Sequence, residues 1–201
     1  MSLISRSISA LKSRPALKLV AAIVLAITLA GCLKFPLGDP ATSKLDSRLE
    51  GSWFYQTDDE RAMARIYPFD AHTYVVEWID FGKDGDAYKI RSRELYKAWL
   101  TDVKKHTFIT LEPLASRLSN ASEDSKMFTI FRLDFGNNTI KATPIKDDFE
   151  ALKEAKSGAD VTATITKEVE NPALYGDAPA DFRKLDAEKD AELLKQMSQM
   201  P

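Results

Sequence analysis

The sequence predicts a mainly β protein: a small antiparallel β-barrel or a strongly curved sheet, with one or two C-terminal helices. Seven or eight short segments rich in β-branched and aromatic residues follow one another after Glu50, with turn residues between them. No long helical pattern separates these segments, as a βαβ protein would require. Residues 49–201 are therefore expected to form a single β-rich domain with a helical C-terminal part.

The expected strands alternate apolar and polar residues over short runs. Turn residues from Asp80 to Asp86, and the sequence Gly136-Asn137-Asn138, each predict a hairpin between two strands. The expected strands in chain order are Ser52 to Gln56, Arg61 to Tyr67, His72 to Ile79, Tyr96 to Val103, His106 to Leu111, Met127 to Phe135 and Asn138 to Thr143.

Helical patterns begin after these strands. Asp147, with Glu150 three residues later, has capping-box spacing and predicts a helix that ends at Gly158. The run from Asp160 to Glu168 alternates like a final strand, although a helix fits it nearly as well. A second helix is expected from Asp186 to Met200, packed on the barrel or facing a partner. Its apolar side holds Leu193, Leu194, Met197 and Met200.

Residues 1–31 have the pattern of a signal peptide. Four of the chain's basic residues precede an apolar run from Leu19 to Ala30, and no acidic residue occurs before Asp39. The run is only about a dozen residues long, whereas a membrane-spanning helix needs about 20. Cys32, the only cysteine, follows in Leu29-Ala30-Gly31-Cys32, which resembles the lipobox of bacterial lipoproteins.

The lipobox resemblance implies cleavage before Cys32, diacylglycerol on its sulfur, and an acyl chain such as palmitate on the new amino group. Two or three acyl chains anchor a protein stably. The membrane is therefore an expected partner, through the lipid on Cys32. We expect a lipid-anchored, periplasm-facing protein of the bacterial cell envelope, on the outer membrane rather than the inner one because Leu33 follows Cys32.

Residues 32–48 are rich in proline, glycine and serine and are expected to form a lipidated tether. The alternative is that Leu33, Phe35 and Leu37 contact the membrane surface or the domain. The segment before Cys32 holds four of the 28 basic residues and none of the 30 acidic ones, so the chain after it has a net charge of about −6. This charge argues against nucleic acid as a partner.

Two family resemblances bear on the domain. Gly51-Ser52-Trp53 resembles the G-x-W start of the lipocalins, in which the tryptophan closes the barrel floor and stacks on an arginine. The resemblance implies that Arg183 is the stacking partner of Trp53. The chain also resembles a family of uncharacterised bacterial lipoproteins, which implies no particular activity. The segments that carry this second resemblance are Pro36 to Pro40, Leu49 to Trp53, Tyr67 to Tyr74, Tyr96 to Leu100, Phe108 to Leu111 and Asn171 to Tyr175.

Aromatic residues on the expected strands form the candidate ligand site. Several of them should point into a barrel, where they either fill it or line a pocket for an apolar ligand. The candidates are Tyr74, Trp78, Tyr96, Trp99 and Phe108.

We expect no catalytic residues, no metal site and no cofactor. The sequence holds no Gly-x-Ser-x-Gly and no glycine-rich nucleotide loop. A calcium loop from Asp80 would need an acidic residue or amide at Gly82 and a glutamate at Arg91. His72 and His106 are the only histidines and lack zinc-ligand spacing.

The sequence therefore favours a non-catalytic domain that binds a small apolar ligand. The alternative is an accessory lipoprotein that docks on an envelope protein through a strand edge or the C-terminal helix. An enzyme is a distant third possibility.

Overall fold

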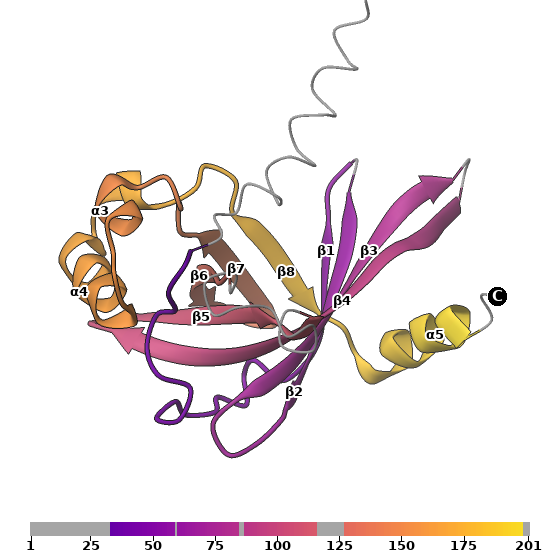
Figure 1. Cartoon of the computed structure of the whole chain (residues 1–201). Coiled ribbons are helices and arrows are strands. Elements are labelled where there is room, and N and C mark those ends of the chain that lie inside the picture. Colours follow the sequence, from indigo (N-terminus) through magenta and orange to yellow (C-terminus); the bar gives the residue numbers. More distant parts are fainter. Residues whose placement is uncertain (1–32, 59, 85–86, 116–126, 199–201) are drawn as a thin grey trace, which may run out of the picture.

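The structure, a computed structural model, describes residues 33–198 except residues 59, 85–86 and 116–126. Eight antiparallel strands, each hydrogen-bonded to the next, form a closed barrel (Figure 1). The expected antiparallel barrel is thereby confirmed, and its up-and-down order is the one that lipocalins use. The strands are β1 (Gly51–Gln56), β2 (Arg61–Pro68), β3 (Tyr74–Asp84), β4 (Ala87–Val103), β5 (His106–Pro113), β6 (Thr129–Phe135), β7 (Thr139–Pro144) and β8 (Ala180–Lys184).

Strand β8 closes the barrel. It pairs with β7, where Phe182 lies opposite Ile140, and with β1, where Lys184 lies opposite Trp53. This strand was not expected from the sequence. A final strand was expected at Asp160 to Glu168 as one of two alternatives, and the structure shows the other one.

That segment is the helix α4 (Gly158–Glu168), and the strand alternative is wrong. Ser157 caps its N-terminus, because its side-chain oxygen accepts a hydrogen bond of 3.2 Å from the backbone N–H of Asp160. Val161 and Ile165, one helical turn apart, are both fully buried. In the sequence, the alternation of threonine with apolar residues makes this four-residue spacing difficult to recognise.

Two other boundaries also differ from expectation. The helix α3 (Glu150–Lys153) begins after Phe149, which makes no side-chain cap, so the predicted cap at Asp147 is wrong. A short 3-10 helix, η2 (Pro172–Leu174), follows α4.

The turn predicted from Asp80 is also misplaced, because β3 continues through a register shift at Asp80/Phe81 as far as Asp84. The predicted β3–β4 hairpin itself is confirmed.

The predicted hairpin between β6 and β7 is confirmed as well. Asn138 has a φ of 57°, which asparagine tolerates in tight turns. The N–H of Gly136 donates a hydrogen bond of 2.9 Å to the carbonyl of Thr139 and closes the loop.

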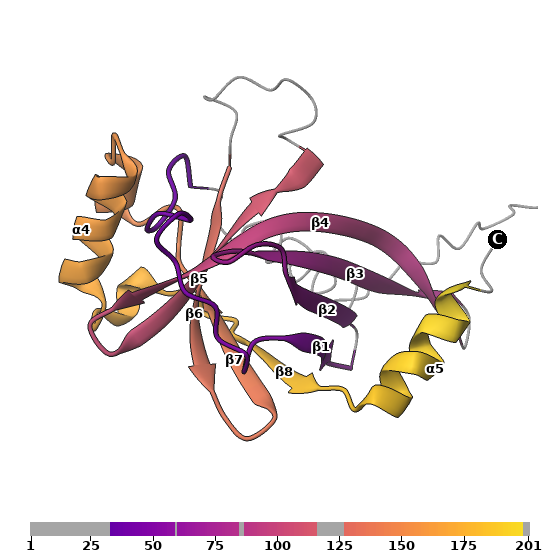
Figure 2. The same cartoon turned by 90° about the horizontal axis from the view of Figure 1, so that it is seen from below.

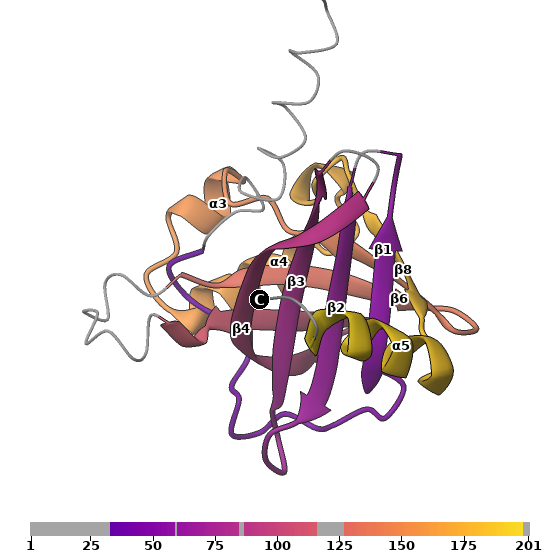
Figure 3. The same ribbon diagram turned by 90° about the vertical axis from the view of Figure 1, so that its right-hand side faces the viewer.

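Helix α5 (Ala187–Ser198) lies across the outer face of β1, β2 and β3 (Figure 3). The hydroxyl of Ser52 on β1 donates a hydrogen bond of 2.7 Å to Asp190 of the helix. Met63 and Ile79, which point outward from β2 and β3, are fully buried. The side chains of Leu193, Leu194 and Met197 and all of Met200 lie outside the described part of the structure.

The core has two parts, separated by the barrel wall. Ile109 and Leu133 point inward to one cluster, whereas Phe108 and Ile130 point outward to another. Helix α4 and the N-terminal segment cover the outer cluster on the side of the barrel opposite α5 (Figure 2). The strands β5 and β6 are therefore buried on both faces.

The segment from Leu33 to Leu37 packs on this outer face, and the chain then reaches the inner cluster at Leu49. Leu37 is fully buried, and its carbonyl accepts hydrogen bonds from Trp99 Nε1 at 2.9 Å and Thr110 Oγ1 at 3.1 Å. Gly38 has a φ of +72°, and a Cβ there would lie 2.1 Å from Thr101 Oγ1. The segment thus contacts the domain, the alternative left open above, instead of extending freely from it.

None of the helices in the described ranges is long and apolar enough to cross a membrane.

Leu37→Ala tests whether this segment belongs to the folded domain. Removing a fully buried leucine should lower the free energy of unfolding by about 2–5 kcal/mol, measured by urea denaturation with tryptophan fluorescence. Lys44→Ala, at an exposed position between Leu37 and Leu49, should change it by less than about 0.5 kcal/mol. Equal, small effects of both substitutions would contradict the packing described here.

Candidate ligand-binding cavity

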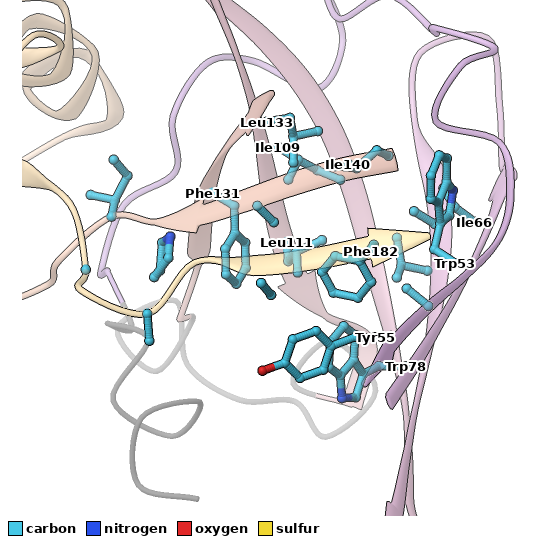
Figure 4. Close-up of a pocket in the computed structure, with 18 of the residues that line it drawn as sticks. Trp53, Tyr55, Ile66, Trp78, Ile109, Leu111, Phe131, Leu133, Ile140 and Phe182 are labelled. Atoms are coloured by element: carbon cyan, nitrogen blue, oxygen red, sulfur yellow. The ribbon is translucent and has the colours of Figure 1, made fainter. Parts of the chain in front are cut away.

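The barrel interior holds a cavity of about 670 Å³ (Figure 4). This volume falls within the range of about 300–1,000 Å³ typical of small-molecule sites. Alternate residues of the strands point into it, as the strand period of two requires. The apolar side chains around it include Leu49, Trp53, Ala64, Ile66, Val76, Trp78, Ile109, Leu111, Phe131, Leu133, Ile140, Ala142, Ala180 and Phe182.

The floor of the cavity is closed by Trp53. Its indole N–H donates a hydrogen bond of 2.7 Å to the carbonyl of Leu49, so the ring has no donor left for a ligand. The ammonium of Lys184 lies 5.2 Å from the ring centroid. The cation over Trp53 is therefore Lys184 and not Arg183, which is exposed on the outer face of β8. Successive residues of a strand point to opposite faces, and this places Arg183 outside.

Beneath the floor, Tyr74 ties the N-terminal segment to the barrel. Its hydroxyl donates a hydrogen bond of 3.1 Å to the carbonyl of Asp46 and accepts one of 2.5 Å from the N–H of Asp46. Burial raises the pKa of the Tyr74 phenol, so the neutral form that makes these bonds is favoured.

Three aromatic rings form one wall of the cavity. The Phe182 ring centroid is 5.6 Å from that of Tyr55 and 5.9 Å from that of Trp78, which it meets edge to face. Trp78 Nε1 donates a hydrogen bond of 2.8 Å to Asp80, and the same carboxylate accepts one of 2.7 Å from Ser92. The wall thus presents apolar ring surface while its indole donor is already engaged.

The mouth of the cavity is acidic. It lies at the end of the barrel where β1 joins β2 and β7 joins β8, and its charged lining is Glu60, Lys146, Asp147, Asp148 and Asp177. Lys146 Nζ lies 3.7 Å from Asp177 Oδ1, in an exposed ion pair. Four carboxylates and one ammonium give this rim a negative charge above an apolar interior.

Only one of the five predicted ligand residues lines the cavity, and this is Trp78. Tyr74 lies beneath the floor, and Tyr96 packs against the interior cluster while its hydroxyl bonds to Glu94. Trp99 and Phe108 point outward, where Trp99 meets Phe128 edge to face at 6.1 Å. These two side chains therefore do not line the cavity.

The five predicted ligand residues do not include Tyr55, Phe131 or Phe182, although Phe131 is one of the strand aromatics expected either to fill the barrel or to line a pocket. Tyr55 shares the inward face with Trp53 by the period of two, so the pattern contained this information. Phe131 shares one face of its predicted strand with Leu133 and Phe135, whereas Arg132 and Asp134 lie on the other face, so the pattern contained this information as well. Phe182 belongs to β8, which had not been recognised.

No group of three or more histidine, cysteine or acidic side chains suited to a metal occurs within the described residues. His72 Nδ1 lies 2.8 Å from the carbonyl of Ser43, and His106 Nε2 lies 3.2 Å from Glu170. Both rings therefore have protein partners and lie apart from the cavity.

The chain matches no protein-family model, no curated protein and no solved structure. The function is therefore inferred from the barrel, its cavity and the sequence motifs.

The phenol of Tyr55 gives a titration test of the wall. Burial is the largest cause that raises its pKa, and the negative charge of Glu60 raises it further. A hydrogen bond with Thr57 lowers it. Above its ordinary pKa of about 10, the unfolded chain loses this proton before the folded one does, so the free energy of unfolding falls with rising pH.

Tyr55→Phe should weaken this alkaline loss of stability, measured by urea denaturation in steps above pH 9. Tyr74 and Tyr175 also have raised pKa values and should leave a residual slope. An unchanged pH dependence in the variant would show that Tyr55 is in contact with water.

Proposed function

We propose that this protein is a lipid-anchored lipoprotein of the bacterial cell envelope that binds a small apolar ligand in its barrel without catalysing a reaction. The observation that carries the proposal is the cavity of about 670 Å³ with its almost entirely apolar interior. Small eight-stranded barrels either fill their interior with side chains or hold a ligand there. A hollow interior favours the second use.

The wall chemistry indicates the kind of ligand. The indole donors of Trp53 and Trp78 are bonded to Leu49 and Asp80, and the charged lining groups belong to the mouth. A polar group carried into the interior would lose its hydrogen bonds to water and find few replacements, which is costly. The buried part of the ligand should therefore be hydrocarbon, and any polar head should stay at the mouth.

Two neighbouring residues of β7 offer a matched test. Ala142 lines the cavity, whereas Lys141 points outward and is exposed. Ala142→Trp should fill the cavity and Lys141→Trp should not. The probe is a long-chain alkyl alcohol that carries a photoreactive diazirine, added to the full chain in phosphatidylcholine nanodiscs, with cross-links mapped by mass spectrometry.

Cross-linking to Phe131, Trp78 and their neighbours is expected in the unmodified protein and in Lys141→Trp. In Ala142→Trp it should fall roughly tenfold, as for a loss of about 1.4 kcal/mol of binding free energy. Circular dichroism checks that both variants are folded. Equal cross-linking of the two variants would refute binding in the cavity.

The anchoring part of the proposal is supported by the lipobox-like Leu29 to Cys32, by the resemblance to bacterial lipoproteins, and by Leu33, which favours the outer membrane. Cys32→Ser should abolish incorporation of an alkyne analogue of palmitate, measured by click labelling of the purified protein. Normal labelling of this variant would overturn the anchor.

The accessory-protein alternative has lost part of its support. It depended on the C-terminal helix as a docking face, and the described contact of α5, from Asp190 to Ser52, is with the barrel. A ligand carrier is therefore the function that the observations favour.

A further inference from the structure

Leu33, the first residue after Cys32, is held firmly in the fold. Its N–H and carbonyl exchange two hydrogen bonds of 2.8 Å with the backbone of Phe128. Its side chain is only 4% exposed and belongs to the outer cluster. The chain is thus fixed in place from its first described residue.

The place where Leu33 is held is the mouth end of the barrel. Phe128 directly precedes β6, and the first residues of β6 pair with the last residues of β5, Thr129 with Leu111. Leu111 and Phe131 line the cavity near its mouth.

The floor end of the barrel lies at the other end of the strands from the attachment point at Leu33. It carries the Trp53 floor and the connections from β2 to β3 and from β6 to β7. Neighbouring Cα atoms along a chain are about 3.8 Å apart. A lipid on Cys32 would therefore be attached one residue from the mouth end, with no spacer between them.

We propose that the lipid on Cys32 holds the barrel with its mouth toward the bilayer, and that the cavity exchanges a single-chain amphiphile directly with this lipid surface. The inference rests on the proposed lipidation and on the proposed binding in the cavity. An amphiphile in a bilayer has its hydrocarbon chain in the membrane and its head at the surface. A mouth at that surface accepts the chain without exposing its length to water, which would be unfavourable.

The charge of the mouth indicates that the lipid anchor, and not electrostatic attraction, would hold the mouth at the bilayer. Its rim carries four carboxylates against Lys146, so an anionic bilayer would repel it. Met127, next to Phe128, is an apolar side chain 52% exposed at this end. The surface that fits the mouth is therefore zwitterionic, such as a phosphatidylcholine bilayer.

Two exposed alanines allow a matched test of this orientation. Ala178 lies at the mouth and Ala71 in the β2–β3 connection at the floor end. Because Cys32 is the only cysteine and the lipid would consume it, Ala178→Cys and Ala71→Cys can each be labelled with one fluorophore. The full chain is reconstituted in phosphatidylcholine vesicles that contain a quencher attached to lipid headgroups.

The fluorophore at Ala178→Cys should be quenched much more strongly than the one at Ala71→Cys. Equal quenching, or stronger quenching at Ala71→Cys, would overturn the orientation even when mass spectrometry shows a lipidated Cys32. A Cys32 without lipid would instead refute the proposed anchor. Loss of diazirine cross-links in the cavity would refute the proposed binding, so the three failures are distinguishable.

A flexible spacer of ten glycine and serine residues between Cys32 and Leu33 provides the second measurement. Such a spacer spans about 16–19 Å on average. It should remove the difference in quenching and slow the transfer of the diazirine alcohol from vesicles to the cavity, while cavity cross-linking at equilibrium stays the same. Unchanged transfer with the spacer would overturn direct exchange with the bilayer.

Discussion

The short pairing between β1 and β8 is the constraint on which the rest of this structure depends. Only two residue pairs join these strands, Trp53 with Lys184 and Phe54 with Arg183. Their register puts Phe182 inside, against Tyr55 and Trp78, and puts the ammonium of Lys184 by the Trp53 ring. Without this pairing the sheet would have two open edges and its concave face would be exposed to water, so there would be no enclosed cavity.

A hollow interior reduces the packing available to the barrel, because side chains around a cavity lack contacts on one side. The outer cluster offsets this loss. Leu37, Phe108, Val161 and Ile165 are fully buried against the outer faces of β4, β5 and β6, and Trp99 is bonded to the Leu37 carbonyl. The N-terminal segment and α4 thus give the sheet a second core. This arrangement leaves the inner face available for the proposed ligand while the outer face supplies stability.

The sequence predicted the barrel well and the site less well, for physical reasons. Strand order and hairpins are local properties, so the period of two and turns such as Gly136 to Asn138 were sufficient. Which face of a strand points inward is not local when both faces are apolar, as at Trp99 and Phe108, because it depends on what α4 covers. β8 has only five residues, and its alternation of charged with apolar residues gained meaning only from its two neighbours. The volume left inside depends on packing, which no pattern of residue types specifies.

The central claim is that the cavity holds an amphiphile with its hydrocarbon chain inside. Native mass spectrometry of the full chain, released gently from nanodiscs made from its host membrane, tests this most directly when compared with Ala142→Trp. The account predicts one additional mass per chain, that of a single-chain amphiphile, on the unmodified protein and not on the variant. The same masses on both proteins, or a bare chain that takes up no added alkyl alcohol, would contradict it.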